Sequence, residues 1–158
     1  MKYLNVAVIG NVLFTRECIE CILKIAGVKI TLVVTRPRKY SSLNSDFCDL
    51  KNVCRKYSLR MIKTRDASSD VAIQALKEAD PDLILVLGYS HILKKTVFNI
   101  PRIGVIGFHP AILPDNRGRH PLVWSLANGL EESGITFFFI DDESVDSGDV
   151  VYQKKLKI

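Results

Sequence analysis

The chain has 158 residues, of which 47% are hydrophobic and 25% are charged, a composition that predicts one globular domain over residues 1–158. No apolar run approaches the roughly 18 residues that span a bilayer, and residues 1–10 lack the features of a secretion signal, so we expect a cytoplasmic protein that contacts no membrane. The net charge of +5 comes from scattered Lys and Arg residues that form no basic face, so we expect a phosphate-bearing small molecule, and no nucleic acid, as the partner.

The first half of the chain alternates short apolar runs with segments whose apolar residues have helical spacing. These patterns predict strands at 4–9, 28–34 and 59–62, and helices at 16–26, 46–57 (capped near Ser45) and 69–79. A strand, a helix and a second strand in this order form a right-handed crossover between parallel strands. The turn after the first strand has no G-x-G-x-x-G pattern, and no P-loop is present, which argues against NAD and ATP.

The second half continues the same alternation and adds two long loops. The patterns predict strands at 83–87, 103–108, 135–140 and 150–158, a short helix before Pro101, and a helix at 122–128. Loop 110–121 contains prolines and glycines, and loop 141–148 is acidic. The whole pattern predicts an α/β fold, in which ligands bind outside the carboxyl ends of the strands.

The four cysteines include one C-x-x-C pair, a spacing found in metal knuckles and in redox pairs. Cys18 and Cys21, which form this pair, fall inside the first predicted helix and lack the second ligand pair of a zinc site. We therefore interpret them, together with Cys48 and Cys54, as buried free thiols.

His109 follows an apolar run at the predicted carboxyl end of a strand. A lone histidine in such a place is more often held by a neighbouring carbonyl than used in chemistry. Asp146, however, follows another strand of the same predicted sheet, and a paired His and Asp act as a general base and the group that orients it. The sequence therefore predicts His109 and Asp146 as a catalytic pair.

The acidic loop that contains Asp146 offers a divalent metal site as an alternative. It has no EF-hand spacing and no His-x-x-x-His partner, so we expect no metal. No serine or cysteine stands in a nucleophile motif, which favours direct transfer without a covalent intermediate.

A second candidate site follows the apolar strand 83–87. Gly88 permits a turn whose backbone groups can bind a flat heterocycle, and Ile92 and Leu93 can supply apolar walls. The alternative is a glycine turn that leads into a short structural helix. The residues alone do not separate these two interpretations.

The segment 106–114, Ile-Gly-Phe-His-Pro-Ala-Ile-Leu-Pro, then Arg117-Gly118, and then Asp-Ser-Gly-Asp at 146–149 resemble the formyltransferases that use 10-formyltetrahydrofolate. That family includes glycinamide ribonucleotide transformylase, methionyl-tRNA formyltransferase and the N-formyltransferases of nucleotide-linked amino sugars. The resemblance covers the chain almost from end to end. It implies a Rossmann-like open, mostly parallel twisted sheet with helices on both faces.

The resemblance also implies roles for individual residues. His109 and Asp146 match the family's catalytic histidine and aspartate. The segments that would hold 10-formyltetrahydrofolate, largely through backbone and without a metal, are Gly88, Tyr89, Ser90, His91, Ile92 and Leu93, then Ala111, Ile112, Leu113 and Pro114, then Asp141, Asp142 and Glu143. The stretches 116–124 and 137–139 resemble the sugar-modifying branch, and the candidate contacts to a nucleotide amino sugar are Asn11, Thr15, Arg117 and Gly118.

One position departs from the family. The family's catalytic triad begins with an asparagine two residues before the histidine, where this chain has Gly107. Residues two apart on a strand point to the same face, so the missing side chain would stand beside His109 and donate to the developing oxyanion. Loss of one such donor typically costs on the order of a hundred- to a thousand-fold in rate. Three interpretations follow. Another amide, such as that of Asn116, replaces the missing donor; a water or a backbone amide replaces it; or the protein binds its ligands without catalysing a reaction. We favour replacement of the donor.

The leading prediction is transfer of a formyl group from 10-formyltetrahydrofolate to the amino group of a nucleotide-linked amino sugar. Methionyl-tRNA formylation, hydrolysis of formyltetrahydrofolate, and folate or nucleotide binding without catalysis are the alternatives. Members of the family usually continue past a strand such as 150–158 into a closing helix and often a dimerisation element. We therefore expect a truncated domain with an open sheet edge, and a homodimer as one possible assembly.

Overall fold

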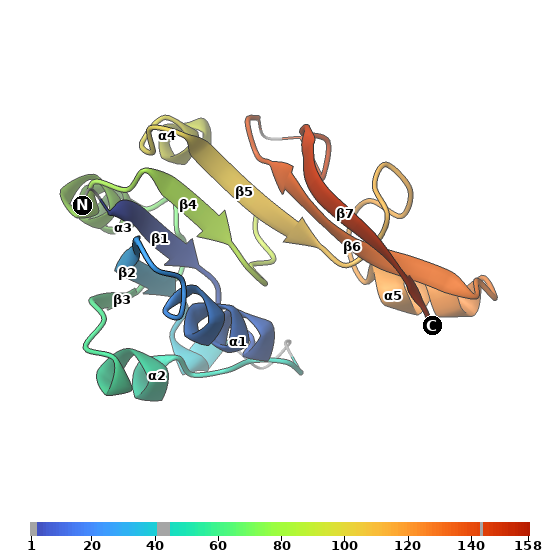
Figure 1. The fold of residues 1–158 in the computed structure, drawn as a ribbon, viewed down its shortest axis with the longest axis horizontal. Coiled ribbons are helices and arrows are strands. Elements are labelled where there is room, and N and C mark those ends of the chain that lie inside the picture. The colour runs from blue at the N-terminus through green and yellow to red at the C-terminus, as the bar shows by residue number, and fades with distance from the viewer. Residues whose placement is uncertain (1–2, 41–44, 143) are drawn as a thin grey trace.

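The computed structural model describes residues 3–40, 45–142 and 144–158 and contains a seven-stranded sheet (Figure 1). The strands are β1 (Leu4–Ile9), β2 (Val28–Thr35), β3 (Met61–Lys63), β4 (Leu83–Val86), β5 (Gly104–His109), β6 (Glu132–Phe139) and β7 (Val150–Lys157). The helices are α1 (Leu13–Ile22), the 3-10 turn η1 (Arg38–Tyr40), α2 (Lys51–Lys56), α3 (Asp70–Ala79), α4 (Lys95–Phe98) and α5 (Pro121–Ala127).

The strand order is β3-β2-β1-β4-β5-β6-β7. The strands from β3 to β5 are parallel, and β6 and β7 extend the sheet beyond β5 as antiparallel strands. The order reverses direction at β1, so the carboxyl ends of β1, β4 and β5 meet at a topological switch point, where open α/β sheets bind ligands. The predicted α/β fold with a mostly parallel sheet is confirmed.

The side chains of β1 alternate between two hydrophobic clusters, one on each face of the sheet. Ala7 and Ile9 belong to the cluster that α3 and α4 cover, and Val6 and Val8 belong to the cluster that α1 and α2 cover. All four side chains are almost fully buried. A strand buried on both faces is what a central parallel strand between two helical layers requires.

Helix α1 begins and ends earlier than the predicted span 16–26. Its first turn contains a hydrogen bond from the Val12 N–H to the Thr15 hydroxyl, at 3.2 Å. Beyond Ile22 the chain makes tight turns, in which the Ile25 N–H donates to the carbonyl of Ile22 at 3.0 Å. Ala26, the last apolar residue of the spacing that suggested a longer helix, is exposed, so the buried face does not continue to it.

Helix α2 is shorter than the predicted span 46–57 because the first part of that span pairs with another loop. The Cys48 N–H donates to the carbonyl of Asn11 at 2.9 Å, which holds this stretch against the loop after β1. Leu50, and not Ser45, therefore occupies the N-cap position. The prediction for α3 is confirmed, with Ser69 as its N-cap.

The cysteines are free, as predicted, but they are not all buried. Cys54 is buried and Cys18 and Cys48 are half-buried, whereas Cys21 is exposed on the outer side of α1. Burial raises the pKa of the Cys18 and Cys54 thiols to about 11, which keeps them protonated. Over the residues that the structure describes, none of the helices is long and apolar enough to cross a membrane.

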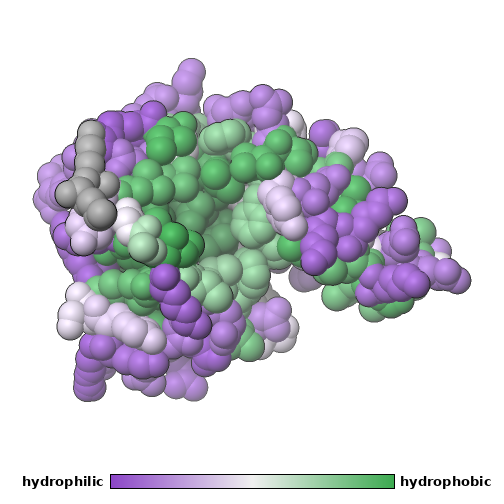
Figure 2. Space-filling model, viewed as in Figure 1, coloured by the Kyte–Doolittle hydropathy of each residue, from purple (hydrophilic) through white to green (hydrophobic). Residues whose placement is uncertain are grey.

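One face of the sheet carries a row of aromatic rings that runs from α1 across the antiparallel edge. Phe14 stacks on Phe108 with ring centroids 4.1 Å apart, Phe108 lies 5.3 Å from Phe137, and Phe137 lies 6.5 Å from Tyr152. Figure 2 shows hydrophobic side chains gathered in the hollowed middle of this face, with polar side chains around it. The row ties β5, which carries His109, to its antiparallel neighbours.

Candidate active site

His109 is the last residue of β5, and its side chain is buried between two oxygen atoms. Its Nδ1 lies 3.3 Å from Asp146 Oδ2, and its Nε2 lies 2.7 Å from the backbone carbonyl oxygen of Asn116. A carbonyl oxygen only accepts hydrogen bonds, so Nε2 carries a proton in this arrangement. The structure thus brings together the predicted catalytic pair, with Asn116 on the other side of the ring.

Asp146 reaches His109 from the loop between β6 and β7. Its backbone is left-handed, with φ of +49°, a conformation that Asp tolerates better than most residues. Its Oδ2 also accepts a hydrogen bond from the backbone N–H of Gly118, at 2.9 Å. One carboxylate oxygen therefore faces both the imidazole and the loop that follows β5.

The position two residues before His109 is enclosed by apolar side chains. A Cβ at Gly107 would lie 2.8 Å from Ile140 Cδ1 and 3.0 Å from Phe138 Cζ. These distances leave no free space for an amide side chain unless Ile140 moves. Among the groups that the structure places at His109, the one from Asn116 is its backbone carbonyl, an acceptor. The expected replacement of the family's amide by the Asn116 side chain therefore stays a prediction.

Thr136 and Gln153 form hydrogen bonds to the loop that follows His109. Sequence analysis predicted neither of them as a site residue. The Thr136 hydroxyl donates to the carbonyl of Ala111 at 2.6 Å and accepts from the Leu113 N–H at 3.2 Å. The Gln153 amide donates to the carbonyl of Leu113 at 2.9 Å. The pairing register of β5, β6 and β7 brings these residues together. The spacing of residues along the chain does not predict that register.

The predicted folate segment 88–93 lies at the carboxyl end of β4. Ser90, His91 and Ile92 are exposed, whereas Leu93 is buried in the hydrophobic cluster beneath α3 and α4. Leu93 therefore packs in the core and is not an exposed wall. Partial burial and the nearby charge of Arg36 lower the pKa of His91, which favours its neutral form.

Gly88 and Tyr89 set the direction of this segment. Gly88 has φ of +70°, and a Cβ there would collide with Val12. The Tyr89 hydroxyl accepts a hydrogen bond from the Ala67 N–H at 2.9 Å, and its ring lies 5.5 Å from that of His91. Burial raises the pKa of Tyr89 above its usual value. The packing of Val12 against Gly88 thus accounts for the glycine at this turn, and residues 90–92, which follow it, are exposed.

The other predicted folate segments are partly engaged within the protein. Ala111 and Leu113 are buried, and both use backbone groups to bind Thr136 or Gln153. Ile112 is half-buried and Pro114 is exposed. In the acidic loop, Asp141 and Asp142 are exposed and Glu143 lies outside the described residues. The described part of the chain has no group of three or more His, Cys, Asp or Glu side chains that could hold a metal ion.

Two of the predicted substrate contacts are buried. Thr15 is fully buried, and its hydroxyl donates to the carbonyl of Leu87 and accepts from the Val12 N–H. Asn11 is also buried. Arg117 is exposed, and Gly118 contacts Asp146 through its backbone N–H. Both hydrogen bonds of the Thr15 hydroxyl are therefore to groups of the protein itself and not to a substrate.

A group of basic side chains surrounds Tyr40 near the carboxyl end of the sheet. The guanidinium carbons of Arg36 and Arg65 lie 5.4 Å and 5.7 Å from the Tyr40 ring centroid, and Lys39 Nζ lies 5.1 Å from it. Arg36 and Arg65 are close enough to His91 to contribute to its lowered pKa. This basic group therefore borders the exposed part of segment 88–93.

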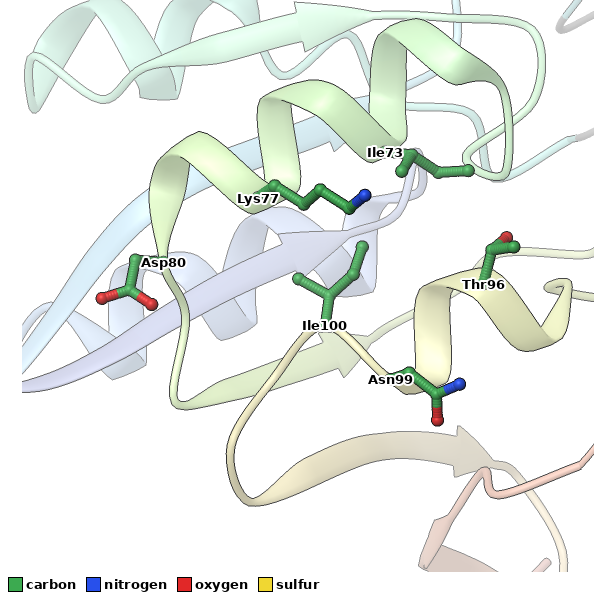
Figure 3. Close-up of a pocket in the computed structure, with 6 residues that line it drawn as sticks. All are labelled: Ile73, Lys77, Asp80, Thr96, Asn99 and Ile100. Carbon is green, nitrogen blue, oxygen red and sulfur yellow. The ribbon is translucent and has the colours of Figure 1, made fainter.

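A hollow of about 450 Å³ lies elsewhere on the molecule (Figure 3). Ile73, Lys77, Asp80, Thr96, Asn99 and Ile100 line it. Asp80 lies just before β4, so the hollow is at the amino end of that strand, away from the end at which ligands bind in such sheets. None of the predicted site residues lines it, and the candidate site is therefore placed at His109.

Comparison with known proteins gives a family match over nearly the whole chain. A family model described as Formyl transferase matches residues 4–158. Methionyl-tRNA formyltransferase of Kosmotoga olearia is 37% identical over 109 residues, which are 69% of this chain and 35% of that protein. The same enzyme of Thermodesulfovibrio yellowstonii is 35% identical over 134 residues, which are 84% of this chain and 43% of that protein. The chain spans less than half the length of these two relatives.

Solved structures match the fold. Glycinamide ribonucleotide transformylase 1 from Geobacillus kaustophilus has a TM-score of 0.80 at 19% identity, with 100% of this chain and 84% of that chain covered. Phosphoribosylglycinamide formyltransferase from Bacillus halodurans has a TM-score of 0.79 at 16% identity, with 98% of this chain and 80% of that chain covered. At these identities the likeness shows the fold alone.

Proposed function

The chain belongs to the formyl transferase family, and we propose that it transfers a formyl group from 10-formyltetrahydrofolate to the amino group of a nucleotide-linked amino sugar. The observation that carries the proposal is the buried contact between His109 Nδ1 and Asp146 Oδ2, 3.3 Å apart, at the carboxyl end of β5. A histidine held by a carboxylate at this end of the sheet suits proton transfer to a bound ligand.

In the proposed reaction, the substrate amine forms a bond to the formyl carbon, and the bond between that carbon and N10 of the folate breaks. The amine loses one proton, and the departing nitrogen gains one. To accept the amine's proton, His109 keeps its own proton on Nδ1, toward Asp146, and presents a free Nε2. Because Nε2 donates to the Asn116 carbonyl in this structure, that contact must break and the Nε2 proton must pass to solvent before Nε2 can take the amine's proton.

The surroundings of segment 88–92 support a flat, acidic co-substrate. Ser90, His91 and Ile92 are exposed there, and the basic side chains around Tyr40 stand beside them. A folate has a planar ring system and an acidic glutamyl tail, so apolar and polar groups of this segment would contact the ring and the cations would face the tail.

Two acceptors are candidates for the formyl group. The resemblance of residues 116–124 and 137–139 to the sugar-modifying branch supports an amino sugar. The names of the curated relatives support methionyl-tRNA as the second candidate, over a match that covers about a third to a half of their length. Arg117 is exposed and lies in the chain between Asn116 and Gly118, whose backbone groups contact His109 and Asp146, and we propose it as a contact to the phosphates of a nucleotide acceptor.

The test measures consumption of 10-formyltetrahydrofolate and the mass of the acceptor. The purified protein is incubated with a panel of nucleoside-diphosphate amino sugars, with methionyl-tRNA, and without acceptor. Formylation of an amino sugar alone is the expected result. Formylation of methionyl-tRNA instead would favour the second candidate. Consumption without acceptor would indicate a hydrolase, and folate binding without consumption would contradict the proposal.

A further inference from the structure

Two backbone groups from one short loop contact the two members of the proposed catalytic pair. The carbonyl of Asn116 accepts a hydrogen bond from His109 Nε2 at 2.7 Å, and the N–H of Gly118 donates to Asp146 Oδ2 at 2.9 Å. The same Oδ2 lies 3.3 Å from His109 Nδ1. Each ring nitrogen of His109 therefore faces an oxygen atom whose position depends on residues 116–118.

The backbone of this loop is left-handed at both contact positions. The φ angles are +53° at Asn116 and +94° at Gly118. Asn is one of the few non-glycine residues that adopt this conformation readily. A Cβ at Gly118 would meet no atom within 4 Å, so the reason for glycine there is the backbone conformation and not a lack of space.

We propose that residues 116–118 are a positioning element for formyl transfer, an inference that rests on the proposed function. The Asn116 carbonyl sets the plane of the imidazole by accepting the Nε2–H hydrogen bond, a contact that opens when the amine takes its place and the Nε2 proton leaves to solvent. The Gly118 N–H holds the Asp146 carboxylate in line with Nδ1. Both contacts use the main chain, so the element acts through its left-handed backbone and not through the Asn116 side-chain amide.

The first test compares two glycines in matched surroundings. Gly27, in the turn between α1 and β2, has φ of +79°, and a Cβ there, as at Gly118, would meet no atom within 4 Å. Gly118→Ala and Gly27→Ala are therefore expected to lower the urea midpoint by similar amounts. Only Gly118→Ala is expected to lower kcat, by about tenfold to a hundredfold, with KM for the folate little changed. Gly118→Asn, which tolerates the left-handed conformation, is expected to recover most of that loss.

The second test needs no acceptor substrate. Nitrogen-15 NMR of the histidine side chains, with His109→Gln to assign the signal, reports the protonated Nε2 and its hydrogen bond. The His109 Nε2–H signal is expected to shift and to exchange faster in Gly118→Ala and in Asn116→Val, because a β-branched residue disfavours the left-handed backbone. Asn116→Gly, which lacks the amide and keeps the backbone freedom, is expected to retain the wild-type signal.

These readouts separate the two proposals. If formyl transfer is never observed, the proposed function fails, while the NMR comparison still measures the positioning of His109. Equal effects of Gly118→Ala and Gly27→Ala on kcat, or an unchanged Nε2–H signal in both Gly118→Ala and Asn116→Val, would overturn the positioning role. Loss of the signal in Asn116→Gly would instead indicate that the side-chain amide is required, which would also overturn it.

Discussion

Thr136 of β6 lies directly opposite His109 of β5 in the antiparallel pair, and its hydroxyl donates to the carbonyl of Ala111 at 2.6 Å. The same oxygen accepts hydrogen bonds from the Leu113 N–H and from the Gln153 amide, at 3.2 Å and 3.0 Å. One fully buried hydroxyl thus ties the loop that leaves the candidate catalytic strand to both antiparallel strands.

Replacement of Thr136 by Val keeps the shape of the side chain and removes this hydroxyl. The buried Leu113 N–H and Ala111 carbonyl would lose their partner, so we expect Thr136→Val to lower the free energy of unfolding by roughly 1–3 kcal/mol. Thr136→Ser keeps the hydroxyl and is the matched control. Urea denaturation followed by circular dichroism measures the difference, and equal midpoints for the two variants would contradict this account.

Removal of the His109 imidazole tests the catalytic assignment. A positioned acid or base contributes typically a hundred- to ten-thousand-fold, so we expect His109→Ala to lower kcat by about that factor. Asp146→Asn keeps the size of the side chain but removes its charge, and we expect a large loss of kcat there as well. Asp149→Asn, which changes the residue directly before β7, is the control and should retain activity. A rate for His109→Ala near that of the wild type would rule out the assignment.

Apolar runs predict the central strands of the described sheet, such as β1, because side chains on both faces of these strands are buried, whereas β7 is exposed along its length. The ends of α1 and α2 could not be predicted in the same way. Asn11 and Cys48, far apart in sequence, share a backbone hydrogen bond, and that tertiary contact ends the regular structure of the span predicted as the second helix. Ala26 continues the helical spacing of the first predicted helix and is nevertheless exposed. Propensity and spacing contain no information on such contacts.

The end of the sheet that carries His109 could be predicted, because strand order places ligands at the carboxyl ends. The contacts of Asn116 and Gly118 could not, since main-chain groups make them and their direction depends on φ. The buried position of Thr15 also escaped prediction. The resemblance to the sugar-modifying branch implied a substrate contact, but the Thr15 hydroxyl donates to the carbonyl of Leu87, at the end of a neighbouring strand.

Thr15 therefore provides a test of stability and not of substrate binding. Thr15→Val removes the donor to the Leu87 carbonyl and the acceptor for the Val12 N–H, both within the buried part of the site. We expect the free energy of unfolding to fall by roughly 1–3 kcal/mol while KM for the amine acceptor stays unchanged. Thr15→Ser serves as the control. A raised KM with unaltered stability would restore Thr15 as a substrate contact.

The cysteines should differ in their reaction with iodoacetamide. The thiolate is the reactive form, and the pKa of Cys18 and Cys54 is raised to about 11, so at pH 8 only about one in a thousand of these thiols is ionised. Raising the pH toward 11 increases that fraction about tenfold per unit, and their labelling should rise accordingly. Cys21 is exposed and should be labelled first. Peptide mass spectrometry measures the order, and labelling of Cys54 as fast as Cys21 at pH 8 would disagree with the structure.

Gly107 is the position at which the chain departs from its family, and the structure shows what restoring the asparagine would meet. The new Cβ would lie 2.8 Å from Ile140 and 3.0 Å from Phe138, so we expect Gly107→Asn to destabilise the fold by about 1–3 kcal/mol and to lower activity.

Shortening Ile140 should reverse part of this effect. The double variant Gly107→Asn with Ile140→Ala removes the Ile140 atoms at 2.8 Å and 3.1 Å from the new Cβ. It should be more stable than Gly107→Asn alone, and also faster, because the amide can then donate to the developing oxyanion. Ile140→Ala by itself is the control for the cavity that it leaves. Urea denaturation measures the stability of the three variants, and formyl-transfer assays measure their rates. If Gly107→Asn alone were as stable as the wild type and faster, the space beside His109 would already be open, and the packing of Ile140 and Phe138 would not be what excludes the family's asparagine.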